Sequence, residues 1–340
     1  MKTGPGRFFE DYALGQVIRH AVPRTLGPGE RALYHALYPA RGAVYSSDEF
    51  ARSVGLRASP LDDLIAFHTV FGKTVPDISL NAVANLGYAE GRWQKPVWPG
   101  DTLRSQSEVI GLKESSSGAA GVVWVRTRGL NQHDAVVLDY VRWVLVRKHR
   151  RDVVVPVAVP ELAASVGPEA LVVPEGLDFT RYDFGLAGEP HRWGDYAVGE
   201  VIDHVDAVTV EEAEHMLATR LWQNTSKVHF DVGQREDGRR LIYGGHLISL
   251  ARALSFNGLA NAQMIVALNA GAHANPCFAG DTVRAWSEVL DRAETEAPGV
   301  GALRLRLVAT KGKAGELRGA DGKYLADVLL DLDYWALVPV

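Results

Sequence analysis

A histidine, an amide and a pair of glycines lie close together in the second half of the 340-residue chain. His229 follows Asn224 by five residues, and Gly244-Gly245 precede a run with apolar residues at helical spacing. A neutral imidazole can remove a proton near pH 7. The backbone N–H of Gly245, near a helix N-terminus, can stabilise negative charge on an oxygen, and glycine lets a ligand approach closely. These groups predict acid–base chemistry on a substrate that develops an oxyanion.

The elements that must position these groups occur twice along the chain. Residues 10–20 read EDYALGQVIRH and residues 194–204 read GDYAVGEVIDH, an offset of 184. The offset falls to 180 where WPGDT at 98–102 meets FAGDT at 278–282. The first copy therefore has four extra residues, around 91–95. A repeat of this length indicates duplication of a whole domain.

The duplication predicts two domains of one fold, at 1–150 and 191–340, with a proline-rich linker at 151–190 that crosses the surface. In each copy a helical pattern precedes stretches that alternate with period two. The helical patterns lie at 61–71 and 246–259, and the strand patterns at 121–127, 136–146, 303–307 and 328–338. One buried helix followed by antiparallel strands indicates the α+β class.

The segment LWQNTSKVHFD at 221–231 resembles the hydratase motif of the MaoC-like hot-dog family, which runs Asp, any residue, Asn, Pro, an aliphatic residue, His, any residue, Asp. His229 takes the position of the catalytic His, and Asn224 stands where the family usually has a catalytic Asp. Ser-Lys replaces the usual Asn-Pro. Gly245 matches the glycine whose N–H faces the substrate carbonyl. The resemblance implies His229, Asn224 and Gly245 as the catalytic residues.

Longer stretches narrow the resemblance. FFEDYALGQ, RALYHALYPAR, NAVANLGYAEGRW, ATRLWQNTSKVHFD and IYGGHLISLARALSFNGLANAQ are similar to the mesaconyl-CoA hydratase family, also called β-methylmalyl-CoA dehydratases. The similarity extends over nearly the whole chain. It implies two hot-dog domains, each an antiparallel sheet wrapped on a central helix, that form a pseudo-dimer. It also implies reversible hydration of a branched dicarboxylic enoyl-CoA, mesaconyl-CoA, to β-methylmalyl-CoA without a metal or redox cofactor.

The first copy lacks this catalytic set. At an offset of 184, Tyr45 meets His229 and Leu61 meets Gly245. A tyrosine with an ordinary pKa of about 10 is a poor base at neutral pH. We predict that the first copy is catalytically silent, completes the pairing of the two sheets and shapes the acyl pocket.

Asn224 requires an explanation, because an amide cannot accept a proton at neutral pH. The implied substrate carries a carboxylate on its β-carbon, and an Asp at position 224 would face that charge. Two like charges about 5 Å apart repel by roughly 3 kcal/mol at an effective dielectric constant near 20. We hypothesise that Asn224 avoids this repulsion and still holds the water or the carboxylate by hydrogen bonds.

The substrate needs further contacts. A cation should hold its carboxylate, and the candidates are Arg220, Lys227 and Arg41. Other residues expected to bind the substrate are Tyr243, Gly244, His246 and Tyr45. An aromatic side chain between cations could stack on the adenine of CoA and meet a phosphate. Arg92, Trp93 and Lys95 have this composition, and the alternative for them is an exposed loop without a ligand.

Composition restricts the classes of partner. The net charge of −5 argues against a nucleic-acid partner. Cys277 is the single cysteine, and the sequence has no apolar run of about 18 residues. We expect no signal peptide, because residues 1–11 lack an apolar core. We therefore expect a cytoplasmic protein with an acyl-CoA substrate, no membrane partner and no metal-ligand spacing, and we leave a homo-oligomer open.

Three other functions compete with the dicarboxylic hydratase. Two are enzymes on the same fold, an (R)-specific enoyl-CoA hydratase for other acyl chains and a thioesterase. The third is a non-catalytic acyl-CoA-binding protein, which Asn224 and the degenerate first copy suggest. Among the other histidines, His20 and His204 recur at equivalent places and indicate a structural role, and His68 is expected in the core.

Overall fold

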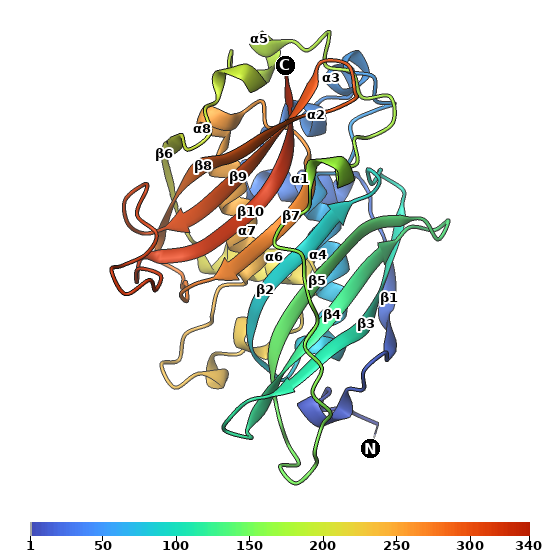
Figure 1. The fold of residues 1–340 in the computed structure, drawn as a ribbon, viewed down its shortest axis with the longest axis vertical. Coiled ribbons are helices and arrows are strands. Elements are labelled where there is room, and N and C mark those ends of the chain that lie inside the picture. The colour runs from blue at the N-terminus through green and yellow to red at the C-terminus, as the bar shows by residue number, and fades with distance from the viewer. Residues whose placement is uncertain (1) are drawn as a thin grey trace.

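The computed structural model describes residues 2–340. Within this range one sheet of ten antiparallel strands has the order β1-β3-β4-β5-β2-β7-β10-β9-β8-β6 (Figure 1). The strands of the first half are β1 (Val17–Thr25), β2 (Ala82–Trp93), β3 (Thr102–Glu114), β4 (Ala120–Leu130) and β5 (Val136–Arg147). Those of the second half are β6 (Val201–Thr209), β7 (Ile265–His273), β8 (Thr282–Glu294), β9 (Val300–Thr310) and β10 (Val328–Pro339).

The helices lie mainly against one face of this sheet (Figure 1). They are α1 (Pro28–Leu37), α2 (Ala43–Ser46), α3 (Asp48–Ser53), α4 (Asp63–Thr74), α5 (Phe184–Ala187), α6 (Glu212–Leu221), α7 (Gly244–Leu254) and α8 (Phe256–Leu259). Short helical turns are η1 (Phe9–Asp11), η2 (Val75–Ser79), η3 (Pro168–Ala170), η4 (Trp193–Asp195), η5 (Lys227–His229) and η6 (Val232–Gln234).

The two halves repeat as the sequence offsets predict. β1 and α1 correspond to β6 and α6 at an offset of 184, and β3 and β4 correspond to β8 and β9 at 180. The four strand patterns found in the sequence fall within β4, β5, β9 and β10. The helical pattern at 246–259 is interrupted, because Gly258 has a positive φ of 96° between α7 and the end of α8.

Each half-sheet wraps around one central helix, α4 in the first copy and α7 in the second. Every residue of α4 is buried, as expected for a helix that is surrounded by sheet and helices. Asp62 caps this helix by accepting a hydrogen bond from the Leu64 N–H at 2.9 Å. The strands show the matching alternation, since β4 buries every second side chain along most of its length.

The two half-sheets join through β2 and β7. These strands pair antiparallel, with Tyr88 opposite Gly271 and Ala89 opposite Ala270. The largest hydrophobic cluster takes side chains from both copies, including Phe67 and Leu247. The copies therefore share one sheet and one core.

The segment between the copies has no strand of its own in the described structure. It crosses the face of the sheet opposite α4 and α7 (Figure 1). On the way its backbone pairs with β3 at Ala158, and the Val166 N–H donates to the Asn269 side chain at 2.8 Å. Several of its side chains, such as Phe179, are buried in a cluster that contains residues of both copies. The segment thus packs on the domains as well as connecting them, and the boundaries at 150 and 190 stay a prediction.

None of the helices described over residues 2–340 has the length and apolar character that a membrane span requires.

Candidate active site

His229 lies in the long connection between α6 and α7. It ends the short turn η5, and 9% of its surface is exposed. Its Nδ1 lies 2.7 Å from the Leu241 carbonyl oxygen, and the Leu241 N–H in turn donates to the Val228 carbonyl. Because a carbonyl only accepts, Nδ1 carries the proton, and Nε2 is left with its lone pair.

Burial sets the protonation state of this imidazole. It lowers the pKa of His229 to about 4, against an ordinary value near 6.5, and the hydrogen bond to Leu241 opposes this shift. His229 is therefore neutral at pH 7, with the unprotonated Nε2 that a general base requires.

The start of α7 provides the second part of the site. The helix begins at Gly244, and Tyr243 at its N-cap makes no side-chain cap. The His246 N–H donates to the Tyr243 carbonyl, and the N–H groups of Gly244 and Gly245 have no partner in the described residues and are left for a ligand. Glycine is required here, since a Cβ on Gly245 would lie 2.4 Å from the Tyr243 ring. The Tyr243 and His229 ring centroids are 5.7 Å apart. Helix start and imidazole therefore face one small region.

Asn224 is buried in the same connection, directly after α6. Its side-chain oxygen accepts a hydrogen bond from the Ser226 N–H at 3.0 Å. The first copy packs against this turn. Gly72 of α4 lies so close to the Trp222 carbonyl that a Cβ on Gly72 would be 1.8 Å from the carbonyl oxygen. Substitution of Gly72 would displace the turn that carries Asn224.

Four more imidazoles surround His229 and Tyr243. Burial lowers the pKa of His215 and His68 to about 3 and that of His246 and His273 to about 4. His215 accepts the Tyr243 N–H at 3.1 Å, and its ring centroid is 6.1 Å from that of His229. These imidazoles are neutral at pH 7, so the site has little net charge of its own.

The first copy reaches this site through His68 on α4. Its Nδ1 lies 3.3 Å from the Tyr243 hydroxyl, and its Nε2 lies 2.7 Å from the Ser249 hydroxyl on α7. The Tyr34 hydroxyl also contacts Ser249 at 3.3 Å. His68 is a core residue as expected, but it also links the two central helices beside the candidate site. An imidazole within an apolar helical pattern was the sequence signal for such a link.

His246 fills a position next to the helix start. It is fully buried, with Nδ1 3.2 Å from the Tyr38 hydroxyl and Nε2 without a partner in the described residues. Tyr38 belongs to the first copy and also accepts the Trp222 indole N–H at 3.4 Å. His246 therefore lies beside the expected substrate region.

The cations suggested by the sequence do not converge on His229. Arg220 at the end of α6 and Lys227 in η5 are exposed. Arg41 stacks on the Phe256 ring, 4.1 Å from its centroid, and lines a cavity together with Tyr45. That cavity also contains Asp62, Arg252 and Gln263, but none of the three predicted catalytic residues. The structure therefore does not bring Arg41 and Tyr45 together with His229, because they line a cavity between the two copies, and their contact with the substrate stays a prediction.

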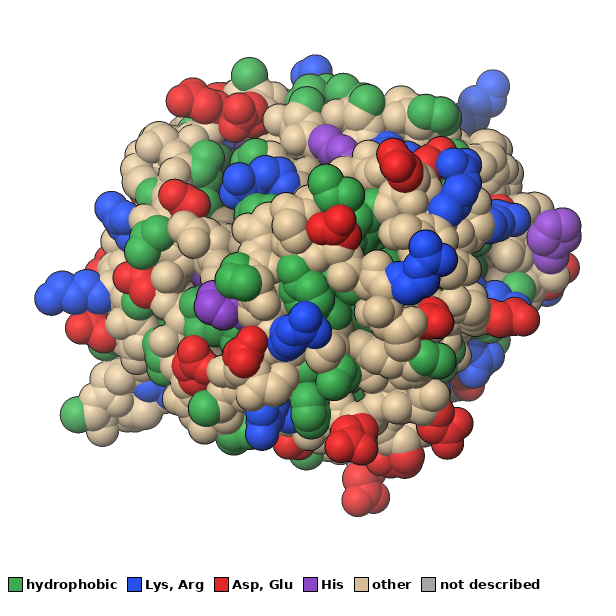
Figure 2. All heavy atoms as spheres, turned by 90° about the horizontal axis from the view of Figure 1, so that it is seen from above, with side chains coloured by type: hydrophobic (Ala, Val, Ile, Leu, Met, Phe, Trp, Pro, Cys, Tyr) green, Lys and Arg blue, Asp and Glu red, His purple; other side chains and the backbone are tan. Residues whose placement is uncertain are grey.

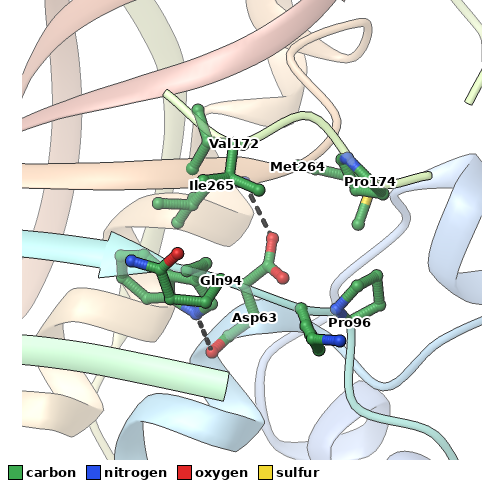
Figure 3. A pocket seen from close by; sticks show the side chains of 10 residues that line it. Asp63, Gln94, Pro96, Val172, Pro174, Met264 and Ile265 are labelled. Carbon is green, nitrogen blue, oxygen red and sulfur yellow. Dashed lines mark hydrogen bonds between the residues drawn. The ribbon is translucent and has the colours of Figure 1, made fainter. Parts of the chain in front are cut away.

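The structure excludes the exposed loop as the alternative for Arg92 and Trp93, and the contact of these two residues and Lys95 with CoA stays a prediction. The extra residues of the first copy lengthen β2 as far as Trp93 instead of forming an exposed loop. The Trp93 side chain is 6% exposed, and its indole N–H donates to the Asp63 carbonyl at 3.0 Å. Figure 3 shows the cavity beyond it, where the Asp63 carboxyl accepts the Ile265 N–H. Trp93 is thus a packing residue, Lys95 is exposed at the rim of this cavity, and Arg92 pairs within the sheet.

Asp231, the acid two residues after His229, turns away from the imidazole. Its carboxylate accepts the Gly233 N–H at 2.9 Å and the Gln234 amide at 2.7 Å. These bonds lower the pKa of Asp231 and fix the turn η6. Across residues 2–340, no group of three or more His, Cys, Asp or Glu side chains is arranged to hold a metal ion.

Five antiparallel strands wrapped on one helix, repeated within a chain, define a double hot-dog protein, and the predicted fold is confirmed. A crystal structure of a protein described as a MaoC domain dehydratase from Chloroflexus aurantiacus superposes with a TM-score of 0.97 at 54% identity, covering 100% of this chain and 99% of that one. A double-hot-dog protein from Mycobacterium tuberculosis shares the fold, with a TM-score of 0.75 at 23% identity over 98% of both chains.

The chain belongs to the mesaconyl-CoA hydratase family, whose model matches residues 2–315. It is 77% identical over 344 residues to the mesaconyl-CoA hydratase of Cereibacter sphaeroides, with both chains covered completely. It is 55% identical over 348 residues to the β-methylmalyl-CoA dehydratase of Chloroflexus aurantiacus, covering 99% of this chain and 98% of the relative. The resemblance found in the sequence is confirmed.

Proposed function

We propose that the protein is a hydro-lyase that adds water across the double bond of mesaconyl-CoA to give β-methylmalyl-CoA, and that it catalyses the reverse dehydration. The relatives named for these two activities support this function. The observation that carries the mechanism is the neutral His229, whose Nε2 is unprotonated beside the uncapped start of α7.

The addition begins with water at His229. Nε2 takes a proton from the water as its oxygen bonds to the β-carbon. The electron pair of the double bond moves toward the thioester, and its carbonyl oxygen becomes enolate-like. The N–H of Gly245 stabilises that oxygen, because the helix N-terminus favours negative charge. Asn224 orients the water without taking a proton.

The second proton goes to the α-carbon. An amide at position 224 cannot supply it, so the His229 imidazolium returns the proton that it took from water. This leaves His229 neutral for the next turnover. One base serving both carbons places the hydroxyl and the hydrogen on the same face of the double bond.

The first copy remains catalytically silent in this proposal. An acyl-CoA is the substrate, and the reaction uses no metal or redox cofactor. Basic and acidic side chains are interspersed on the face drawn in Figure 2, and neither kind forms an extended patch of its own there. With the net charge of −5, this supports a small-molecule ligand over a nucleic acid. The cytoplasmic location and any homo-oligomer stay predictions.

The test is turnover of mesaconyl-CoA and of crotonyl-CoA, followed by loss of the enoyl-thioester absorbance, with His229→Ala and Tyr45→Phe as a matched pair. We expect turnover of mesaconyl-CoA that His229→Ala abolishes and Tyr45→Phe preserves. Turnover of crotonyl-CoA alone would instead identify a general enoyl-CoA hydratase. Binding of both thioesters without turnover would identify a non-catalytic acyl-CoA-binding protein.

A further inference from the structure

The proposed substrate brings a carboxylate into the protein, and the candidate site has no cation at its centre. His229 and the imidazoles around it are neutral, and Arg220 and Lys227 are exposed. Burying an unpaired carboxylate is costly, so a cation should lie within reach of the acyl group. The inference below rests on the proposed function.

Arg142 on β5 is a buried cation of the first copy. Its side chain is fully buried and lies on the inner face of the sheet, with its guanidinium carbon 4.4 Å from the centroid of the Phe71 ring on α4. The position is unusual for its strand, because the neighbours on the same face are Tyr140 and Val144, both fully buried. A charge at this depth should have a partner.

No carboxylate in residues 2–340 forms an ion pair with Arg142. One nitrogen, Nη2, donates to the Thr74 hydroxyl at 2.7 Å and approaches the Ser79 hydroxyl at 3.5 Å. Nε and Nη1 are buried and have no hydrogen-bond partner. The nearby acid on η2, Asp77, is already held by Arg7 and His20. Two nitrogens of a buried guanidinium are therefore left for a group from outside the chain.

Two series of contacts connect Arg142 with the start of α7. In the first, the Phe71 ring under the guanidinium lies 6.1 Å from the Tyr243 ring, which is next to Gly245. In the second, Arg142 is opposite Tyr88 on β2, and the Tyr88 hydroxyl reaches His273 at 3.2 Å.

The second series ends at the helix start itself. The His273 ring covers Gly244 so closely that a Cβ there would be 2.4 Å from its Cε1 atom. Both routes therefore run from the guanidinium to Gly244-Gly245 through two aromatic side chains in succession. The charge of Arg142 is near enough to oppose part of the rise that burial causes in the pKa of Tyr243.

We propose that Arg142 binds the free carboxylate of the substrate and so makes the enzyme specific for a dicarboxylic acyl-CoA. In an extended acyl group about 5 Å separates the thioester oxygen from the carboxylate carbon, since four bonds of roughly 1.5 Å join them. With a hydrogen bond of about 3 Å at each end, the cation must lie on the order of 10 Å from the Gly245 N–H. The two successive contacts between β5 and α7, 4.4 Å from the guanidinium carbon to the Phe71 centroid and 6.1 Å from that centroid to the Tyr243 centroid, are of this order.

The assignment gives each copy a separate task. The second copy binds the reacting carbons at His229 and the thioester at Gly245. The first copy binds the free carboxylate at the other end of the acyl group through Arg142. Asn224 fits the same arrangement, because it keeps a second negative charge away from the carboxylate. A guanidinium suits this role, since its planar donors match a carboxylate and it is more weakly hydrated than an ammonium.

The test compares succinyl-CoA with butyryl-CoA, two saturated thioesters that cannot be hydrated. They have the same chain length and differ in a terminal carboxylate against a methyl group. Binding is measured by calorimetry for the full chain, for Arg142→Met and for Tyr140→Phe. Tyr140→Phe is the matched control, because it removes a buried hydroxyl without a partner from the same strand face but leaves the charge. Arg142→Met should fold, since it removes an unpaired buried charge, which is costly, and keeps most of the side-chain volume.

We expect the wild-type protein and Tyr140→Phe to prefer succinyl-CoA by about 30-fold, the size of a charge-assisted hydrogen bond. Arg142→Met should lose this preference and keep its affinity for butyryl-CoA. An unchanged preference in Arg142→Met would overturn the proposal, and so would equal loss of both ligands. A wild-type protein that binds both ligands but hydrates neither mesaconyl-CoA nor crotonyl-CoA would reject the proposed function instead.

A second measurement does not depend on a variant. In a crystal structure of the wild-type protein with succinyl-CoA, the free carboxylate should lie within about 3 Å of Nε or Nη1 of Arg142. A carboxylate bound instead to Arg220, Lys227 or solvent would contradict the assignment.

Discussion

The central helices of the two copies begin in different ways, although the folds around them correspond strand by strand. In the first copy, the Asp62 carboxylate accepts the Leu64 N–H and closes the end of α4. In the second copy, α7 starts about three residues earlier relative to the repeat, at Gly244, and has no side-chain cap. The protein itself provides a hydrogen-bond acceptor for the N-terminus of α4, whereas the N-terminus of α7 is left for a ligand. A hot-dog domain can thus be made structural or catalytic at one helix end.

The residues that precede these helices differ in the same sense. Tyr45, at the position of His229, donates its hydroxyl hydrogen to the Asp63 carboxyl group. Burial raises the pKa of Asp63 to about 8, and the Ile265 N–H binds the same carboxyl. Tyr45 and Asp63 of the first copy are therefore already paired within the protein, whereas His229 keeps Nε2 free.

The largest effect should come from removing the base. His229→Ala should lower kcat/KM for mesaconyl-CoA by roughly 10³-fold, the usual contribution of a general base, with little loss of stability. Tyr45→Phe should change kcat/KM less than twofold, because Tyr45 lines the cavity beside Arg41 and Phe256, which contains none of the predicted catalytic residues. Rates from enoyl-thioester absorbance and melting temperatures from calorimetry check both variants. Equal losses of activity in the two variants would mean that both copies take part in the chemistry.

The open helix end gives the next effect. Gly245→Ala should lower kcat about 10²-fold, because a methyl group 2.4 Å from the Tyr243 ring must displace the oxyanion donor. The corresponding change in the first copy, Leu61→Ala, creates a cavity and should cost about 3 kcal/mol of unfolding free energy with activity kept. Urea unfolding and initial rates measure the two losses. An active Gly245→Ala enzyme would exclude this helix start as the oxyanion site.

A charge at position 224 tests the comparison between substrates. Asn224→Asp should reduce kcat/KM for mesaconyl-CoA by about 100-fold, the equivalent of roughly 3 kcal/mol of repulsion. Activity on crotonyl-CoA, which has no carboxylate, should stay the same or rise. The ratio of the two kcat/KM values is the measurement. Full activity of the variant on mesaconyl-CoA would reject the repulsion hypothesis.

The smallest effect concerns pH. With a pKa of about 4, His229 stays neutral at pH 6, where an imidazole of pKa about 6.5 would be roughly three-quarters protonated. We expect kcat/KM to change less than twofold from pH 7.5 to 6. A profile that falls with an apparent pKa of 6.5 would show that His229 is not buried in the free enzyme.

Below pH 6 the protein should lose stability and unfold. Six imidazoles, five of them buried and that of His273 half-buried, have pKa values near 3 or 4 when folded and about 6.5 when unfolded, so the unfolded chain binds more protons between these values. Each such group lowers the unfolding free energy by up to about 1.4 kcal/mol per pH unit as the pH falls below 6.5. Acid inactivation should therefore coincide with loss of the folded signal in circular dichroism.

The repeat explains which features could be predicted from the sequence. The offset and the alternation of apolar residues are local signals, and they located β4, β5, β9 and β10 correctly. The motif around His229 and Gly245 is equally local. The strand at Trp93 could not be predicted, because four extra residues can lengthen a strand as readily as a loop, and only pairing with β5 and β7 decides between the two.

The contributions of the first copy to the site could not be read from local pattern. His68 meets Tyr243, 175 residues further along the chain. Arg142 did carry a signal, since it is a charge on the inward-facing side of an alternating strand, between Tyr140 and Val144. That pattern marks a buried charge, but the aromatic layer that leads from it to α7 exists only in the folded chain.

The pairing of β2 with β7 has a consequence for how the protein behaves on dilution. Two separate subunits joined along such a strand pair would come apart as their concentration fell, and each half-site would lose its complement. Here both partners belong to one polypeptide, so their effective local concentration is set by the linker and is independent of the amount of protein. Specific activity should therefore stay constant down to the lowest concentration at which turnover can be measured.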